Sequence, residues 1–590
     1  MKRFLLGLLT GVVVTLSIAS GAGYLLLRST VPAGQAERLF ADVIPAKSHP
    51  SLAEQTAIFE KRIEEVSQGV YVAIGYGLAN VIIVDAPDGL ILIDALESIE
   101  AAEELLPRIT ALREKSGKEI TDVIYTHNHP DHVFGTGVLL REQETKARIW
   151  AQEHTADHVH ETVNVLRPIT FQRGMRQFGV YLPEETFENS GIGPRLHFAH
   201  NAGMFYLEPT NTIDERFEGT IAGESFIIQH APGETDDQLF LFLPDRGILL
   251  PADNYYHSFP NLYAIRGTSY RDVRQWAASI DLMIGMNANI LIPQHTQPVF
   301  GADTIREQLT NYRDAIQYVH DQTIRMINRG MTPDEIAATI ELPPHLVDLP
   351  YLQEFYGRVD WSARAVFAGT LGWFSGDPED LLPVAKHRES ELMVRLAGDT
   401  DRLREEFTTA MQEDEPAWAL VLATHLDRLG EADAPSLRAA ALTALGEREI
   451  SATGRNYFLT CAAEANGFVI PPSNSHSTPI EVFDQFPIKT FLPSLQVSLR
   501  AEEVLNLETA FGFRFTDIKE DYTLRIRRGV VIVTEGLAED RAGTLITTSR
   551  TFKEIAMNRL KPAAAVVNGT IEVEGGAAAL SRFMDYFDPR

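Results

Sequence analysis

The sequence predicts a multidomain protein whose largest part is an α/β unit, followed by an all-α domain and an α+β domain. Its 590 residues exceed what one compact core usually holds, so several domains are expected. Short β-branched runs alternate with helical stretches from Val70, amphipathic helices dominate from Met331, and strand-like runs return after Pro479. These three changes of pattern divide the chain into three folded units.

The first unit covers residues 69–330. It opens with short strands at VYVAIGY, NVIIVDAPDG and LILIDA, which precede a helix at Ile99–Lys115 and the strand ITDVIYT. Strands and helices keep alternating up to a helix near residues 270–284 and a long helix near 303–328. This alternation is typical of layered α/β folds, in which functional residues gather at strand ends.

The other two domains are predicted at residues 331–470 and 480–590. The helical domain begins with Thr332, Pro333 and Glu335, which fit the N-cap, the first helical residue and the third helical residue of a capping box. The polar stretch PPSNSHSTP at 471–479 is predicted to be a linker.

The N-terminus is predicted to be a targeting segment. Lys2 and Arg3 precede an apolar run from Phe4 to Leu27 that is long enough to cross a hydrocarbon core of ~30 Å. Residues 1–30 are therefore either an uncleaved signal anchor or a signal peptide, and residues 31–68 connect them to the first domain. The two basic residues keep the N-terminus in the cytoplasm, so we expect the rest to be periplasmic, inner-membrane anchored or secreted.

Charge and cysteine content narrow the possible functions. Lys and Arg number 52 and Asp and Glu number 81, so the formal net charge of −29 repels nucleic-acid phosphates, and no nucleic-acid partner is expected. Cys461 is the single cysteine, so a metal ion would have to be held by histidines and carboxylates.

The motif HNHPDH at 127–132 follows the strand ITDVIYT directly. Alternate residues of an extended chain point the same way, so His127 and His129 can bind one metal ion. The turn at Pro130 then directs Asp131 and His132 toward a second ion. The spacing therefore predicts two adjacent metal ions.

Three further candidate ligands follow later strands. Glu234 comes after SFIIQHAPG, Asp253 after ILLPA, and His295 after ANILIPQ. Taken alone, each is a weak signal, because a carboxylate in a turn is usually solvated or caps a helix. Their order after the first motif makes them candidates for the same site.

In this order of residues, the sequence resembles the metallo-β-lactamase superfamily. The resemblance implies an αββα sandwich as the catalytic domain, with two zinc ions. By position, the first zinc ion would be held by His127, His129 and Glu234, the second by Asp131, His132 and His295, and Asp253 would bridge them. A glutamate at the turn position, usually histidine in the superfamily, resembles the alkylsulfatase branch. Many members of that branch also carry glutamate at the bridging position, where this chain has aspartate.

Other segments resemble the same branch. The stretch SFPNLYAIRGTSYRD is similar to the segment in which an asparagine and an arginine receive the sulfate group, and these correspond to Asn261 and Arg266. Residues 350–378 resemble the start of the helical dimerisation domain, and VVNGTIEVEGGAAALSRFMDYFD resembles a sterol-carrier-like C-terminal domain. A homodimer is implied by the resemblance alone. Arg266 could otherwise form an ordinary salt bridge.

The resemblance implies a zinc-dependent alkylsulfatase that converts long-chain, dodecyl-sulfate-like esters into alcohol and sulfate. The residues do not decide whether hydroxide attacks sulfur or carbon. Two alternatives stay open: a di-zinc hydrolase of another ester, lactone or phosphoester, and a membrane-anchored lipid-binding or scaffold protein whose metal site is vestigial.

Several residues near these motifs have secondary interpretations. Asp94 either orients a metal ligand or caps the following helix. A helix surface is expected to carry His154, His158 and His160. Packing is expected for Trp361, Trp373 and Phe374. The pocket could be lined by Tyr206 and residues 191–203. The C-terminal domain is expected to form a hydrophobic wall for the alkyl chain.

Overall fold

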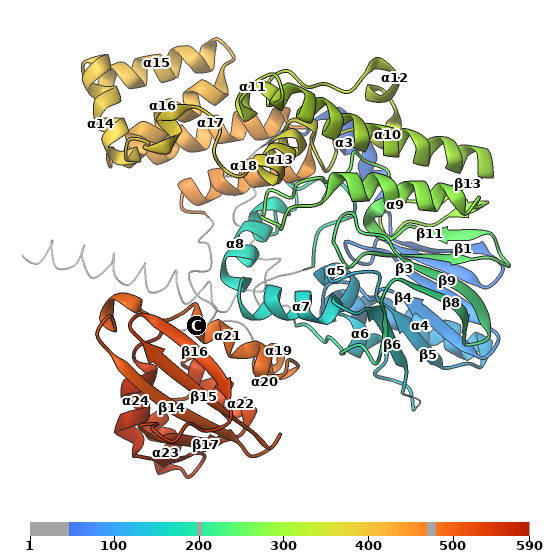
Figure 1. Cartoon of the computed structure of the whole chain (residues 1–590). Helices are drawn as coiled ribbons and strands as arrows, with labels where there is room; N and C mark the ends of the chain where they lie inside the picture. The colour runs from blue at the N-terminus through green and yellow to red at the C-terminus, as the bar shows by residue number, and fades with distance from the viewer. Residues whose placement is uncertain (1–45, 145, 198–202, 469–479, 589–590) are drawn as a thin grey trace, which may run out of the picture.

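The computed structural model describes residues 46–144, 146–197, 203–468 and 480–588 (Figure 1). The targeting segment at 1–30, residues 31–45 of the connecting segment and the linker at 471–479 lie outside these ranges. Among the residues described, no helix combines the length and the hydropathy needed to span a bilayer. A short helix, α3 (Pro50–Gln55), leads into the first domain.

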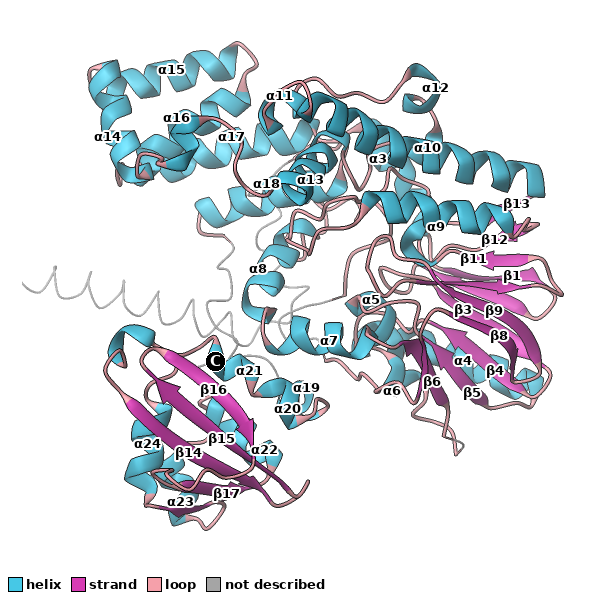
Figure 2. Ribbon diagram, in the orientation of Figure 1, coloured by secondary structure: helices cyan, strands magenta, loops and turns pink. Residues whose placement is uncertain are grey.

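Two sheets that pack face to face form the centre of the first domain (Figure 2). Residues on their inner faces, such as Ile82 and Ile228, share one apolar core. The first sheet has seven strands in chain order, namely β1 (Arg62–Ser67), β2 (Val70–Ile74), β3 (Val81–Ala86), β4 (Gly89–Ile93), β5 (Ile120–Ile124), β6 (Arg148–Gln152) and β7 (Asn211–Ile213). The second has six, in the order β13 (Val299–Phe300), β12 (Ile290–Leu291), β11 (Ile248–Leu250), β10 (Leu239–Leu243), β9 (Glu224–His230) and β8 (Arg216–Ile221).

Helices cover the outer face of each sheet. The helix α4 (Ile99–Ser116) packs on the first sheet, and α9 (Val273–Gly285) and α10 (Ala302–Ile327) pack on the second. Because β3 and β4 are buried on both faces, their sequences are apolar almost throughout. The αββα sandwich expected from the resemblance is therefore confirmed, and the three predicted helices lie within a few residues of their expected ends.

The helical domain follows α10 directly. The predicted capping box is present, because the Thr332 side chain accepts the N–H of Glu335 and the Glu335 carboxylate accepts the N–H of Thr332. The helices are α11 (Pro333–Ala337), α12 (Pro344–Val347), α13 (Val359–Leu371), α14 (Lys386–Ala397), α15 (Thr400–Gln412), α16 (Pro416–Arg428), α17 (Ala434–Arg448) and α18 (Ala452–Ala465). The expectation of an all-α domain is confirmed.

The C-terminal domain is α+β, as expected. Its sheet has the order β16 (Val530–Glu535), β15 (Glu520–Arg527), β14 (Glu508–Phe515), β17 (Thr544–Thr547) and β18 (Glu572–Glu574). Phe513 packs against Phe552 and Phe583 of the helices on one face of this sheet. The helices are α19 (Ile480–Asp484), α20 (Ile488–Phe491), α21 (Pro493–Gln496), α22 (Ser549–Ala556), α23 (Pro562–Val567) and α24 (Ala577–Met584).

Candidate metal centre and its pocket

The candidate ligands lie where strands of the two sheets end. The motif at 127–132 begins three residues after β5 and continues into the short helix α5 (Pro130–Val133). Asp253 lies in a turn after β11, and His295 follows β12. Buried strands thus deliver these side chains to one place, because the ends of neighbouring strands meet at the same edge of the sandwich.

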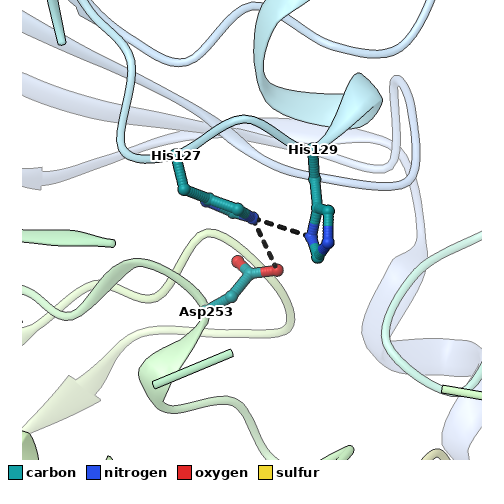
Figure 3. A group of neighbouring side chains, drawn as sticks. All are labelled: His127, His129 and Asp253. Carbon is teal, nitrogen blue, oxygen red and sulfur yellow. Dashed lines mark hydrogen bonds and ion pairs between the residues drawn. The ribbon is translucent and has the colours of Figure 1, made fainter. Parts of the chain in front are cut away.

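His127, His129 and Asp253 form the first group of possible ligands (Figure 3). Nε2 of His127 lies 2.9 Å from Nδ1 of His129 and 3.7 Å from Oδ2 of Asp253. All three side chains point toward one another.

Asp131, His132 and His295 form the second group, and all three are buried. Nε2 of His132 lies 3.4 Å from Oδ2 of Asp131 and 3.5 Å from Oδ2 of Asp253, and Nε2 of His295 lies 3.1 Å from the same Asp253 oxygen. One oxygen of Asp253 therefore faces histidines of both groups, the position expected of a bridging ligand. We call the six residues of the two groups the metal floor.

The metal floor fits a pair of zinc ions. Nε2 of His132 and Oδ1 of Asp253 are buried without a hydrogen-bond partner among the described residues. Leaving such atoms unpaired costs free energy that a bound cation would recover. Imidazole nitrogens and carboxylate oxygens are the ligands that zinc takes in catalytic sites.

Hydrogen bonds on the far side of each ring direct the free nitrogens inward. The Thr126 hydroxyl donates to Asp94, so it accepts from Nδ1 of His127 at 3.0 Å. Nδ1 of His132 donates to Asp94 at 2.8 Å, and Nδ1 of His295 donates to the carbonyl of Leu78 at 2.9 Å. Each of the three rings therefore directs its Nε2 into the site.

Asp94 orients the candidate ligand His132 and does not cap the following helix. Ser98 caps α4 instead, by accepting the N–H of Ala101. Asp94 is fully buried, and its backbone is in the left-handed region, with φ of 63°. Three hydrogen bonds, from His132 and from the hydroxyl and N–H of Thr126, hold it in this strained conformation.

The charge of Asp253 is stabilised by its neighbours. Burial by itself would raise its pKa, but His295, His132 and His127 hold the pKa of this carboxyl well below its usual value. Burial lowers the pKa of His127 well below the usual range, so its ring stays neutral. His132 and His295 differ from His127: burial lowers their pKa, but Asp253 and Asp131 outweigh it and raise the pKa of both rings. Metal binding would therefore release the protons that these two rings share with the carboxylates.

Glu234 lies beside the metal floor but outside both groups. Its Oε1 accepts from Nη1 of Arg271 at 2.7 Å, and its Oε2 is buried without a partner among the residues described. Burial raises the pKa of Glu234 to about 7, although Arg271 opposes the shift. Asp253, and not Glu234, accompanies His127 and His129 in this structure, so the expected place of Glu234 as a ligand remains a prediction.

Of the two predicted sulfate-binding residues, Arg266 lies in the pocket and Asn261 does not line it. Nη2 of Arg266 donates to Nε2 of His129 at 3.1 Å. Asn261 is buried beneath the pocket, where its N–H donates to the hydroxyl of Tyr256 at 2.7 Å and its side-chain nitrogen has no partner among the described residues.

The sequence analysis missed two residues of the site. Arg271 lines the pocket, and its Nε and Nη2 have no hydrogen-bond partner within the described part of the chain. Asp237 accepts from the Asn128 amide at 2.6 Å and from the Thr155 hydroxyl at 2.7 Å, so it holds the residue between the two histidines of the motif. Arg271 lies within the segment SFPNLYAIRGTSYRD, and Asp237 follows Glu234 closely in the chain. In sequence alone, an arginine beside an aspartate and an aspartate in a turn are typical of surface residues, so neither was predicted to belong to the site.

The pocket above the metal floor has a volume of about 480 Å³. One side is formed by helices α7 (Thr155–Asn164) and α8 (Arg167–Gln177), and we call the apolar residues of this side the helical wall. They are Val163, Leu166, Phe171, Met175 and Phe178. A further part of the lining is formed by residues 266–272, which include both arginines.

The expectation that the C-terminal domain walls the pocket is wrong for this arrangement. None of the residues lining the pocket comes from the described range 480–588. The helix α8 of the helical wall is supported by the helical domain, because Arg176 of α8 forms three hydrogen bonds with Glu464 of α18, at 2.8, 2.9 and 3.1 Å. Met175 thereby faces the pocket from a helix that is fixed on its other side.

The histidines near α7 do not all lie on the surface. His154 is exposed and precedes the helix, and His158 is paired with Asp236 at 3.1 Å. His160, expected on the surface, is buried, and its Nε2 lies 2.6 Å from Oε1 of Glu208. Tyr206 is buried as well and does not line the pocket, whereas Ile192 and Leu196 of the stretch 191–203 do, as expected.

Comparisons with known proteins agree with these domains. Residues 74–295 match the sequence model of the metallo-beta-lactamase superfamily, residues 332–467 match alkyl sulfatase dimerisation, and residues 476–590 match alkyl sulfatase C-terminal. A linear primary-alkylsulfatase of Pseudomonas sp. (strain ATCC 19151) is 32% identical over 522 residues, covering 86% of this chain and 98% of the relative.

More distant relatives have the same architecture. An (R)-specific secondary-alkylsulfatase of Pseudomonas sp. is 29% identical over 541 residues, covering 89% of this chain and 81% of the relative. The solved structure of the stereoselective inverting sec-alkylsulfatase Pisa1 from Pseudomonas sp. is 27% identical, covers 94% of this chain and 89% of its own, and superposes with a TM-score of 0.85. The similarity thus extends over all three domains and through the metal floor, and this chain belongs to the alkylsulfatase family.

Proposed function

We propose that this protein is a two-zinc alkylsulfatase that hydrolyses long-chain alkyl sulfate esters to an alcohol and sulfate. One arrangement carries the proposal: two groups of metal ligands share Asp253, beside Arg266 and Arg271, at the base of a pocket with an apolar wall. The complete donor set speaks against the alternative of a binding protein with a vestigial metal site.

The metal floor would hold the two ions. When bound, the ions would supply a water nucleophile that is activated at neutral pH, together with positive charge near the ester. His132 and His295 would bind through Nε2, because their Nδ1 atoms are engaged with Asp94 and Leu78. Glu234 would join the first group through Oε2, which has no partner among the described residues, while Oε1 keeps its contact with Arg271.

The two arginines would bind the sulfate group. Nδ1 of His129 faces the other ligands of its group, so in the metal-bound protein its Nε2 would carry the proton and could not accept from Arg266. Arg266 would then be free to donate to a sulfate oxygen. A planar guanidinium matches the geometry of a tetrahedral oxyanion and stabilises the negative charge that develops as the ester bond breaks.

The helical wall would bind the alkyl chain. Val163, Met175 and Phe178 are buried apolar residues that face the pocket. Burial of a dodecyl chain at ~0.8 kcal/mol per methylene group could contribute up to about 9 kcal/mol before the cost of ordering the chain. This wall favours a long-chain sulfate over a small polar ester, lactone or phosphoester.

A homodimer through the helical domain is part of the proposal. The segment after α13 exposes large apolar side chains, including Trp373 at 76% and Leu382 at 89%. Trp373, which was expected to pack, contacts Phe374 but is otherwise largely exposed in the single chain, so further packing would require a second copy. Exposed apolar side chains that gather in one region usually mark an interface, and the match of this domain to alkyl sulfatase dimerisation supports a second copy as the partner.

The cellular location remains a proposal that rests on the sequence alone. The apolar run within residues 1–30 supports export from the cytoplasm, with attachment to the inner membrane if the segment is not cleaved. Cell fractionation together with N-terminal sequencing of the mature protein would test it. A full-length protein in the cytoplasmic fraction would contradict this location.

The activity is tested by sulfate release from decyl and dodecyl sulfate, with the purified protein stripped of metal and then reloaded with zinc. We expect release that depends on about two zinc ions per chain and that an Arg266→Ala variant loses while it retains the metal. Phenyl phosphate and carboxylic esters serve as comparison substrates. Preferential hydrolysis of either would refute the proposed substrate and leave the metal site standing.

A further inference from the structure

A short extended strap, residues 203–207, lies between the metal centre and the C-terminal domain. On one edge, the N–H of Phe205 donates to the carbonyl of Phe134 at 2.7 Å, and the carbonyl of Phe205 accepts from the N–H of Gly137 at 2.8 Å. Gly137 has no side chain, and an added Cβ would lie 2.2 Å from the Phe205 ring. The strap is therefore bound closely to the segment that follows the metal-binding motif.

The other edge of the strap is bound by the C-terminal domain. The Gln485 side chain donates to the carbonyl of Met204 and accepts from the N–H of Tyr206, both at 2.7 Å. In extended chain, successive residues direct their backbone groups to opposite edges, so one amide side chain can satisfy both groups that the metal-side contacts leave free. Gln485 thus acts as a neighbouring strand would.

Stacked aromatic rings continue from the C-terminal domain toward the ligands. Phe486 stacks on Tyr206 with ring centres 5.9 Å apart, and Tyr206 stacks on Tyr125 at the same distance. All three rings are buried, and they belong to one apolar core that the two domains share. Tyr125 is held in place by hydrogen bonds of its hydroxyl with Thr136 at 2.8 Å and the carbonyl of Leu207 at 3.0 Å.

Tyr125 immediately precedes Thr126, which belongs to the hydrogen-bonded network that orients the candidate metal ligands. Its neighbour Thr126 donates to Asp94, and Asp94 accepts from His132. Rings that pack at fixed centre distances restrict where the backbone of residues 125 and 126 can lie. The position of Phe486 therefore bears on two of the six residues of the metal floor, His127 and His132.

The C-terminal domain holds Gln485 and Phe486 rigidly. Lys553 of α22 is buried, and its Nζ donates to the carbonyls of Phe483 at 2.7 Å and Phe486 at 2.6 Å. The turn between α19 and α20 is thus fixed to the body of its own domain before it contacts the strap. Figure 1 shows these two helices projecting from the C-terminal domain toward α7.

We propose that Gln485 and Phe486 are positioning residues of the metal centre: through the strap, the C-terminal domain holds the metal-binding loop in the geometry needed to retain zinc. This inference rests on the proposed two-zinc function. It assigns the C-terminal domain a role in metal retention and turnover, and no role in contacting the alkyl chain.

The test uses the zinc-loaded full chain and the variants Gln485→Met and Phe486→Leu, which remove the hydrogen bonds and the ring and keep most of the side-chain volume. Zinc retention is measured by competition with a chromophoric chelator, beside kcat and KM for decyl sulfate. We expect zinc retention to be about tenfold weaker, which is the lower end of the loss usual when an outer contact of a metal ligand is removed. We also expect a lower kcat and an unchanged KM.

Thr490→Val is the matched control, because Thr490 accepts from Asn164 across the same domain boundary at 3.3 Å without contacting the strap. It should retain zinc as the unaltered protein does. Unchanged zinc retention in both strap variants, or an equal loss in Thr490→Val, would overturn the inference, as would a higher KM with normal zinc retention. If the unaltered protein binds no zinc, the proposed function fails instead, which the same titration shows. Thermal unfolding of each variant confirms that it is folded during the measurement.

Discussion

The metal floor and the helical wall face the same pocket, but they are built in different ways. The floor comes from the ends of buried strands, and three of its four histidine rings, His127, His132 and His295, have a hydrogen bond behind the inward-facing nitrogen, to Thr126, Asp94 or Leu78. The wall is one side of two helices and makes its contacts through apolar side chains. Because hydrogen bonds are directional, small displacements in the metal floor should weaken metal binding strongly. Apolar packing is not directional, so the helical wall should tolerate substitutions with a smaller loss of activity.

The supports of the two regions differ as well. The floor is tied to the sandwich itself and, through the strap, to the C-terminal domain. The wall is tied to the helical domain by Arg176 and Glu464, and its helix α7 also contacts the C-terminal domain through Asn164 and Thr490. Changes to the floor should therefore act on metal and turnover, and changes to the wall should act on the choice of substrate.

The largest effect is expected from Asp253→Asn. This change removes the charge that faces His127, His132 and His295 and leaves the volume nearly constant. Loss of several kcal/mol of transition-state stabilisation corresponds to a fall in kcat of roughly a thousandfold. Zinc content by metal analysis and kcat for decyl sulfate would check it. Near-normal activity with two zinc ions bound would show that Asp253 is not shared by both groups.

Arg266→Ala should lower kcat/KM by about 10²- to 10³-fold, the usual range for loss of a donor to a developing oxyanion. Because Arg266 contacts the floor only through Nε2 of His129, zinc retention should stay close to that of the unaltered protein. Steady-state kinetics and chelator competition on the same preparation separate the two effects. A parallel loss of zinc would mean that Arg266 supports the metal and does not bind sulfate.

Asp94→Asn should weaken zinc retention by about 10- to 100-fold. The amide oxygen can still accept from His132 and from the Thr126 hydroxyl, as Oδ2 does, but the amide nitrogen in place of Oδ1 cannot accept from the Thr126 N–H, and the negative charge behind His132 is lost. Crystallography of the zinc-bound variant would reveal a reoriented His132 ring. If zinc retention and the orientation of the His132 ring were both unchanged, the metal floor would not depend on the hydrogen bonds behind its histidine rings.

The smallest effect is expected from Met175→Ala in the wall. The loss of ~1.5 to 3 kcal/mol of apolar contact would reduce kcat/KM for dodecyl sulfate by about ten- to a hundredfold at most. Hexyl sulfate, whose chain would extend less far, should be hydrolysed almost normally. Equal losses of kcat/KM for both chain lengths, or a loss of bound zinc, would show that the helical wall does not act separately from the metal floor.

Much of the floor could be predicted from the chain because its residues occupy fixed positions relative to strands. The motif at 127–132 requires only the alternation of an extended chain to bring His127 and His129 together, and the apolar runs identify the strands that precede Asp253 and His295. The three-domain division and the capping box at Thr332 follow in the same way, because local patterns of hydropathy and capping decide them.

Only the tertiary structure decided which residues stand behind and around these ligands. The contacts of Asp237 with Asn128 and of Gln485 with Met204 join residues that are 109 and 281 positions apart. The same folding paired Glu234 with Arg271 and left Trp373 exposed. It also assigned the wall of the pocket to α7 and α8 in place of the C-terminal domain. Sequence by itself determined the reactive groups and the elements that carry them, because both depend on local spacing. Their partners depend on how whole domains pack, and no local pattern records that.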